Sequence, residues 1–266
     1  MSIMKSGTDM KANQTGFLEV NDINLYYEVY GEGKPLVLIH GGGSSIQLDF
    51  KETISRLSQD FMLIGIDLQN HGRSDHREIP ETFEQDARDI ITLLRKLGIE
   101  KASFFGFSNG ATSIMKIAAL FPEKVDKIIA ASGVYKRSGM MNGFFEGMEQ
   151  ITIDIMPAYL KENFLRLNPD ESKLYNMFWK DSQRMVHFED WNDEMFLNIS
   201  KPVLLIYGDQ DVIKAAHAAE LHHLLPDSRL LILPAAHGTY MMADEKGNTN
   251  DTMIDFTLLQ IKNFLQ

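Results

Sequence analysis

The chain has 266 residues, of which 44% are hydrophobic and 24% are charged, a composition typical of a globular protein with a sizeable core. Its formal net charge of −11 disfavours nucleic acid and anionic membrane surfaces as partners, because both attract basic patches. The absence of cysteine excludes disulfides, cysteine-based zinc sites and a thiol nucleophile.

The first residues of the chain are polar. Residues 1–16 contain no apolar stretch of the kind that a signal peptide carries, so we expect residues 1–15 to form a flexible tail. No segment of the sequence approaches the roughly 18 apolar residues that a membrane-spanning helix requires. These features predict a cytoplasmic protein.

Strands and helices alternate through the first half of the chain. Two alternating apolar runs within residues 17–30 break at Asn21-Asp22, which predicts two antiparallel strands joined by a tight turn. Apolar runs predict four buried strands, and amphipathic runs predict helices between them; the strands are expected over residues 36–39, 61–67, 102–107 and 125–131, and the helices over residues 47–57, 83–97 and 109–121. This alternation predicts an α/β fold with a mostly parallel sheet wrapped by helices.

The alternation stops between residues 133 and 198. This stretch is rich in methionine and aromatic residues, including Trp179 and Trp191, and it has helix-like runs but no convincing strand. We therefore expect a helical cap over residues 133–198, inserted after the sixth strand into a core domain of residues 16–132 and 199–266. The cap methionines either only pack the cap or also line an apolar pocket, since methionine adapts to irregular surfaces.

The strand pattern resumes after the cap. Strands are predicted over residues 202–207 and 229–233, with helices over residues 213–225 and 250–266. Each strand is followed by a polar motif, Gly-Asp-Gln-Asp at residues 208–211 and His-Gly at residues 237–238. Polar residues at these positions are expected at the edge of the sheet where parallel strands end.

A serine between two glycines follows the strand predicted over residues 102–107. The sequence Gly106-Phe107-Ser108-Asn109-Gly110 is typical of a nucleophile elbow, a strained strand-to-helix turn where glycines leave room for the crossing backbone. The helix that follows begins with unpaired N–H groups, and its positive end stabilises negative charge near Ser108. Since the pentapeptide alone arises by chance in about one chain of this length in ten, its context has to decide.

The context is the order of three polar residues along the chain. Ser108, Asp211 and His237 each follow a predicted buried strand, in the order serine, acid, histidine. With the glycine loop at residues 40–43 and the motif at residues 67–74, this order makes the chain similar to the α/β-hydrolase superfamily from about residue 17 to the C-terminus. The resemblance implies an α/β-hydrolase fold and a serine hydrolase of the esterase or lactonase kind.

The chemistry of a serine hydrolase gives each residue a role. A serine hydroxyl needs an adjacent base, which is His237, and Asp211 would fix the tautomer of that histidine. The oxyanion of the tetrahedral intermediate needs preorganised N–H donors. We assign the backbone N–H groups of Asn109 and Gly42 to this oxyanion hole, with Gly43 as the close alternative.

Other polar residues near the motifs have simpler interpretations. Asp209 competes with Asp211 as the acid, but the family pattern places the acid at the fourth position of Gly-x-x-Asp. We expect His40 and His71 to brace the backbone of their loops, and the remaining histidines other than His237 to be solvated or to lie on helix faces. We expect no cofactor and no metal site, because the neighbouring histidines at 222 and 223 would diverge on a helix.

One departure from the family pattern is tolerable, and two further features narrow the predicted reaction. Asn70 stands where a glycine is common, and asparagine can adopt the left-handed backbone that a glycine would supply. The elbow carries Ser108 and not an aspartate, which disfavours haloalkane dehalogenase and epoxide hydrolase chemistry. The loop after residue 40 lacks the Gly-Gly-Pro-Gly of proline iminopeptidase-like members, which makes a peptidase less favoured.

These patterns together predict a cofactor-independent serine hydrolase of small to medium, largely apolar esters, lactones or thioesters, acting through an acyl-enzyme. One alternative keeps the triad but hydrolyses a carbon–carbon bond. Another is a ligand sensor on the hydrolase scaffold, which would bind a ligand or turn it over slowly. The expected partner is a small-molecule substrate, with no nucleic acid or membrane partner, and the oligomeric state stays open.

Overall fold

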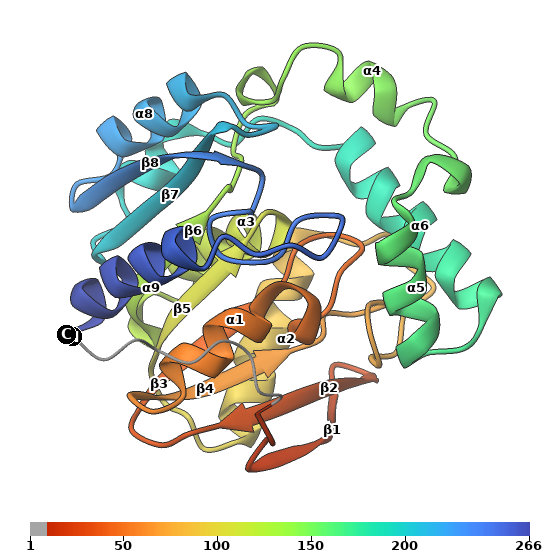
Figure 1. The fold of residues 1–266 in the computed structure, drawn as a ribbon, viewed down its shortest axis with the longest axis horizontal. Coiled ribbons are helices and arrows are strands. Elements are labelled where there is room, and N and C mark those ends of the chain that lie inside the picture. Colours follow the sequence, from red (N-terminus) through yellow and green to blue (C-terminus); the bar gives the residue numbers. More distant parts are fainter. Residues whose placement is uncertain (1–9) are drawn as a thin grey trace.

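A mostly parallel sheet of eight strands forms the centre of the fold (Figure 1). The computed structural model describes residues 10–266. Its strands are β1 (Gln14–Val20), β2 (Ile23–Tyr30), β3 (Lys34–Ile39), β4 (Phe61–Ile66), β5 (Ala102–Phe107), β6 (Val125–Ala131), β7 (Val203–Gln210) and β8 (Ser228–Ala236). They lie in the order β1-β2-β4-β3-β5-β6-β7-β8. Pairing is antiparallel from β1 to β2 and from β2 to β4, and parallel elsewhere, which confirms the α/β prediction.

The two N-terminal strands form the predicted hairpin. Val20 pairs with Ile23 across a two-residue turn, and Asn21 and Asp22 both have positive φ, at 46° and 74°. β1 already begins at Gln14, which pairs with Val29, so residues 14 and 15 belong to the sheet. The predicted tail over residues 1–15 is therefore wrong at its last two residues. The part of that expectation over residues 1–9 lies outside the described residues.

Helices cover both faces of the sheet, because alternate strand residues point to opposite faces. Phe105 and Leu38 pack with helices α1 and α9 on one face, whereas Phe104 and Val37 pack with α2, α3 and α8 on the other (Figure 1). The helices are α1 (Ile46–Leu57), α2 (Phe83–Lys96), α3 (Asn109–Leu120), α4 (Phe144–Met148), α5 (Ala158–Leu167), α6 (Glu171–Val186), α7 (Asp193–Leu197), α8 (Ala215–Leu224) and α9 (Asp251–Leu265).

The chain between β6 and β7 is helical. It contains α4 to α7 and the short 3-10 turns η2 (Arg137–Gly139) and η3 (Ile153–Ile155); a further turn, η1 (Pro122–Lys124), precedes β6. Helices α5 and α6 lie beside the sheet and not within its two helical layers (Figure 1). Their contact encloses a small apolar core of its own, made of Met156, Phe164, Leu174, Met177 and Phe178. Within residues 10–266, no helix has both the length and the apolar character needed to cross a bilayer.

The parallel strands bring their carboxyl ends to one edge of the sheet. The loops after β3, β5, β7 and β8 therefore meet there, although they are far apart in sequence. These four loops contain the residues that sequence analysis selected.

Replacing Phe105 with alanine should lower the free energy of unfolding by about 3–5 kcal/mol. Its side chain has no exposed surface and meets the edge of Phe50, with ring centres 5.1 Å apart. Phe256→Ala is a matched control, because Phe256 is 44% exposed on α9. Urea denaturation of both variants measures the difference, and equal losses would contradict this description of the core.

Candidate active site

Ser108 lies at a sharp turn between β5 and α3. Its backbone has φ +53° and ψ −120°, a conformation that costs a non-glycine residue about 1–3 kcal/mol. The flanking glycines make the turn sterically possible: a Cβ on Gly106 would lie 2.4 Å from the carbonyl oxygen of Gly110, and one on Gly110 would lie 2.1 Å from that of Ile39. The N–H of Ser108 donates to the Ala131 carbonyl at 2.8 Å, which ties the turn to β6.

The loops after β7 and β8 bring an acid and a histidine to this serine. His237 Nε2 lies 3.1 Å from Ser108 Oγ, and His237 Nδ1 lies 2.7 Å from Asp211 Oδ1. The hydrogen bonds assign the proton of a neutral ring to Nδ1, which leaves Nε2 as the acceptor for the serine hydroxyl. Asp209 is exposed and accepts from the backbone N–H of Ala235, so Asp211 and not Asp209 lies beside the histidine.

The carboxylate of Asp211 is fully buried, and both of its oxygens accept hydrogen bonds. Burial opposes its ionisation, yet the hydrogen bond and charge of His237 outweigh burial and hold the pKa of Asp211 below its ordinary value. Ser132 Oγ donates to Asp211 Oδ2 at 2.5 Å and lies 2.7 Å from the hydroxyl of Tyr240. Sequence analysis missed Ser132, although it follows the strand predicted over residues 125–131 and so shares the sheet edge with Ser108.

Two backbone N–H groups beside Ser108, those of Asn109 and Gly42, find no acceptor in the part of the chain that the structure describes. Asn109 is the first residue of α3, so its N–H has no partner within the helix. Among residues 10–266, no acceptor reaches the N–H of Gly42. The N–H of Gly43, the alternative oxyanion donor, instead donates to His71 Nε2 at 3.0 Å.

His40 and His71 hold the backbone of the neighbouring loops. His40 accepts from the N–H of Leu68 at 3.0 Å, and burial lowers its pKa to about 3, so the ring is neutral. His71 is under opposing influences: burial favours the neutral ring, whereas Asp181 nearby raises its pKa to about 9. The same ring nitrogen cannot accept from Gly43 and carry a proton toward Asp181, and the 3.0 Å contact with Gly43 corresponds to the neutral ring.

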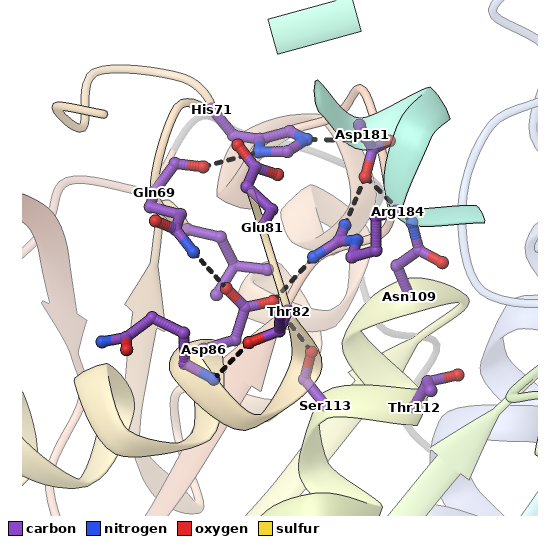
Figure 2. Close-up of polar contacts among 12 residues, drawn as sticks. Gln69, His71, Glu81, Thr82, Asp86, Asn109, Thr112, Ser113, Asp181 and Arg184 are labelled. Atoms are coloured by element: carbon purple, nitrogen blue, oxygen red, sulfur yellow. Dashed lines mark hydrogen bonds and ion pairs between the residues drawn. The ribbon is translucent and has the colours of Figure 1, made fainter. Parts of the chain in front are cut away.

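A buried charged network joins the cap helix α6 to the core (Figure 2). Arg184 forms ion pairs with Asp181 on its own helix and, at 2.8 Å, with Asp86 on α2. Asp181 also accepts from the side-chain amide of Asn109 at 3.1 Å, directly beside the elbow. Sequence analysis missed this network, because its members lie on three elements that only the tertiary fold brings together.

The network continues through the loop after β4. Gln69 and Ser113 donate to Asp86 at 3.1 and 3.2 Å, so Asp86 is enclosed by donors (Figure 2). Glu81 accepts from the side-chain amide of Asn70 at 3.0 Å. Burial raises the pKa of Glu81 to about 7, despite the positive charge of Arg184 nearby.

Helix α6 separates two cavities. One, of about 190 Å³, adjoins Gly42 and Gly43 and is mainly apolar; its cap residues include Met148, Ile151, Ile155, Met156, Pro157, Leu160, Met177, Phe178 and Met185. The other, of about 720 Å³, lies on the opposite face of α6 and is lined by none of Ser108, Asp211 and His237. These three residues do not line the smaller cavity either, but the smaller cavity is the one that reaches the glycine loop, at Gly42 and Gly43.

Comparisons with known proteins agree with this fold. A family model described as alpha/beta hydrolase fold matches residues 34–244, which is well over half of the chain. Among curated proteins, the chain is similar to the serine hydrolase BPHL of Homo sapiens, with 27% identity over 248 residues that cover 85% of this chain and 81% of that protein.

Two solved structures share the fold. A meta-cleavage product hydrolase from Pseudomonas fluorescens IP01 superposes with a TM-score of 0.76 at 20% identity, covering 96% of this chain and 97% of that one. An enol-lactonase from Burkholderia xenovorans LB400 gives a TM-score of 0.73 at 20% identity, covering 94% and 99%.

Replacing Arg184 with methionine should destabilise the protein by about 3–5 kcal/mol, since it leaves Asp86 and Asp181 without their buried counter-ion. Lys101→Met is the control, because Lys101 pairs with Asp126 on an exposed surface, where such a pair contributes at most about 1 kcal/mol. Chemical denaturation measures both. A loss for Arg184→Met no larger than for the control would contradict the network.

Glu81→Gln should change how stability depends on pH. The pKa of Glu81 is about 7 in the folded protein against an ordinary 4.5, so the folded state binds the extra proton between these values. The free energy of unfolding of the parent therefore falls as pH rises from about 4.5 to 7, by on the order of 1–3 kcal/mol from this residue.

The glutamine variant lacks that component, so its stability relative to the parent should be higher at pH 8 than at pH 5. Urea denaturation at the two pH values measures the effect. The same difference between variant and parent at both pH values would show that Glu81 does not titrate in this range.

Proposed function

The chain belongs to the alpha/beta hydrolase fold family, and on this premise we propose that it is a serine hydrolase of small to medium, largely apolar carboxylic esters, lactones or thioesters. The position of His237 between Ser108 and Asp211, at 3.1 and 2.7 Å, is the observation that carries the proposal. Ser108 is the nucleophile, His237 the general base and Asp211 the acid that orients it.

Acylation begins when Ser108 Oγ attacks the substrate carbonyl carbon. As the new carbon–oxygen bond forms, the hydroxyl proton moves to His237 Nε2, and the ionised Asp211 stabilises the imidazolium. The carbonyl oxygen becomes an oxyanion that accepts from the N–H groups of Asn109 and Gly42, each worth about 3–4 kcal/mol. Collapse of this intermediate breaks the bond to the leaving group, which takes the proton from His237.

Deacylation reverses these roles with water. His237 Nε2 takes a proton from a water molecule as that water attacks the acyl carbon, and the oxyanion forms again at Asn109 and Gly42. The bond to Ser108 then breaks, the proton returns to its Oγ, and the carboxylic acid leaves. No step requires a cofactor.

The cavity beside the glycine loop supports an apolar substrate. Four methionines and several aliphatic side chains line it, and none of its lining residues in the described chain is lysine or arginine. Arg184, whose partner Asp181 accepts from Asn109 of the elbow, already pairs with Asp86 and Asp181. A substrate with its own carboxylate, such as the dienoic diketone of the carbon–carbon alternative, would find no unpaired cation among these cavity residues.

Ser108→Ala should lower kcat for p-nitrophenyl acetate or butyrate by about 10⁶, because loss of the nucleophile disables the whole triad. Ser55→Ala on α1 is the matched control and should keep the parent rate, since the hydroxyl of Ser55 bonds only to its helix neighbours, donating to the Glu52 carbonyl at 3.0 Å and accepting from Arg56 at 3.4 Å. Release of p-nitrophenol under multiple turnover measures both variants.

Activity of Ser108→Ala within tenfold of the parent would contradict the proposal. Parent turnover far below the usual range of about 1–10³ s⁻¹ on every ester tested would instead favour the ligand sensor.

A further inference from the structure

Asp181 is a charged residue in an otherwise apolar pocket wall. It lies on α6 and lines the 190 Å³ cavity, together with the cap methionines and with Gly42 and Gly43. No other residue that lines this cavity in the described chain carries a charge, and Ser182, its one hydroxyl residue, donates to the carbonyl of Phe178. A substrate that enters the cavity therefore meets a single ionisable side chain.

One oxygen of this carboxylate is satisfied and the other is not. Oδ1 accepts from the Asn109 side-chain amide and from Arg184. Within residues 10–266, no hydrogen-bond donor reaches Oδ2; His71 Nε2 is 3.9 Å away, beyond hydrogen-bond distance. The side chain keeps 15% of its surface exposed and Asp181 lines the cavity, so the carboxylate is accessible to a molecule there.

Oδ2 also lies beside the proposed oxyanion hole. It is 2.2 Å from the position that a Cβ on Gly42 would occupy, and the side-chain nitrogen of Asn109 is 2.6 Å from the same point. Gly42 and Asn109 are the two residues whose N–H groups would bind the carbonyl oxygen. A substrate whose carbonyl oxygen binds these N–H groups would therefore bring its acyl carbons near Oδ2.

The charge of Asp181 makes this position selective. Burial disfavours the carboxylate, but the guanidinium of Arg184 outweighs burial and holds the pKa of Asp181 well below its ordinary value. An anion beside the oxyanion hole repels the oxyanion of a purely apolar substrate. A substrate that offers an O–H or N–H donor to Oδ2 removes that penalty and gains a charge-assisted hydrogen bond.

Resting on the serine hydrolase function proposed above, we infer that Asp181 is a specificity-determining residue that selects acyl groups with a hydrogen-bond donor on the carbon adjacent to the scissile carbonyl. The preferred substrates are esters, lactones or thioesters of 2-hydroxy or 2-amino acids with a short apolar side chain. In such a substrate the apolar side chain would pack against the methionines of the cavity, and the O–H or N–H group would donate to Asp181.

The test compares phenyl butyrate with phenyl 2-hydroxybutyrate, which differ by one hydroxyl. For the parent, kcat/KM for the hydroxy ester is divided by kcat/KM for phenyl butyrate. This ratio is then divided by the same ratio of the base-catalysed hydrolysis rates in solution, which removes the difference in intrinsic reactivity between the two esters. The corrected ratio should favour the hydroxy ester by about 10- to 100-fold, the contribution of a hydrogen bond to a charged group. A corrected ratio near one for the parent enzyme overturns the inference, and this measurement requires no variant.

Asp181→Asn supplies the second measurement. Asparagine can still accept from Asn109 and Arg184, but it removes the charge at Oδ2, so the corrected ratio should fall about 10- to 100-fold. Glu171→Gln is the control, because it removes the charge of an exposed carboxylate on the same helix. It should leave the corrected ratio unchanged.

The remaining outcomes separate this inference from the proposed function. An equal loss on both esters in Asp181→Asn would mean that Asp181 has only a structural role, which overturns the inference and leaves the hydrolase intact. No hydrolysis of either ester by the parent, together with no fluorophosphonate labelling, overturns the proposed function itself.

Discussion

The left-handed turn at Ser108 is the constraint on which the rest of the site depends. β5 and α3 can cross so closely only because Gly106 and Gly110 have no Cβ, and this crossing holds the serine hydroxyl at the carboxyl edge of the sheet. The parallel strands β7 and β8 end at the same edge, which puts Asp211 and His237 within hydrogen-bond distance of each other. The packing along the whole sheet thus compensates for the backbone strain at Ser108.

The cap makes a second contribution, since α6 does more than cover the serine. One of its faces packs methionines toward the cavity, while Arg184 and Asp181 reach the core through Asp86 and Asn109 (Figure 2). Buried ion pairs add little net stability but are costly to break, so this network fixes the position of the cap relative to the elbow. Asp181, a member of this network, also lines the cavity.

Much of this could be predicted from the sequence because it depends on local patterns. The turn at Asn21 and Asp22 and the left-handed Asn70, with φ +64°, follow from backbone preferences, and the mostly parallel sheet follows from alternating strands and helices. Ser132 and Asp181 could not be predicted, since their roles arise from contacts between distant elements. His217 lies on a helix, which is one of the two expectations for it, but its burial and its stacking on Tyr135 depend on η2 and α7 covering α8.

The central claim is that Ser108 is the hydroxyl side chain that His237 activates, since within residues 10–266 it is the serine 3.1 Å from His237 Nε2. Labelling with a fluorophosphonate followed by peptide mass mapping tests it most directly. A single adduct on the peptide that contains Ser108, abolished when His237 is replaced by alanine, is the predicted result. An adduct on another residue, or labelling of Ser108 that persists without His237, would contradict the account.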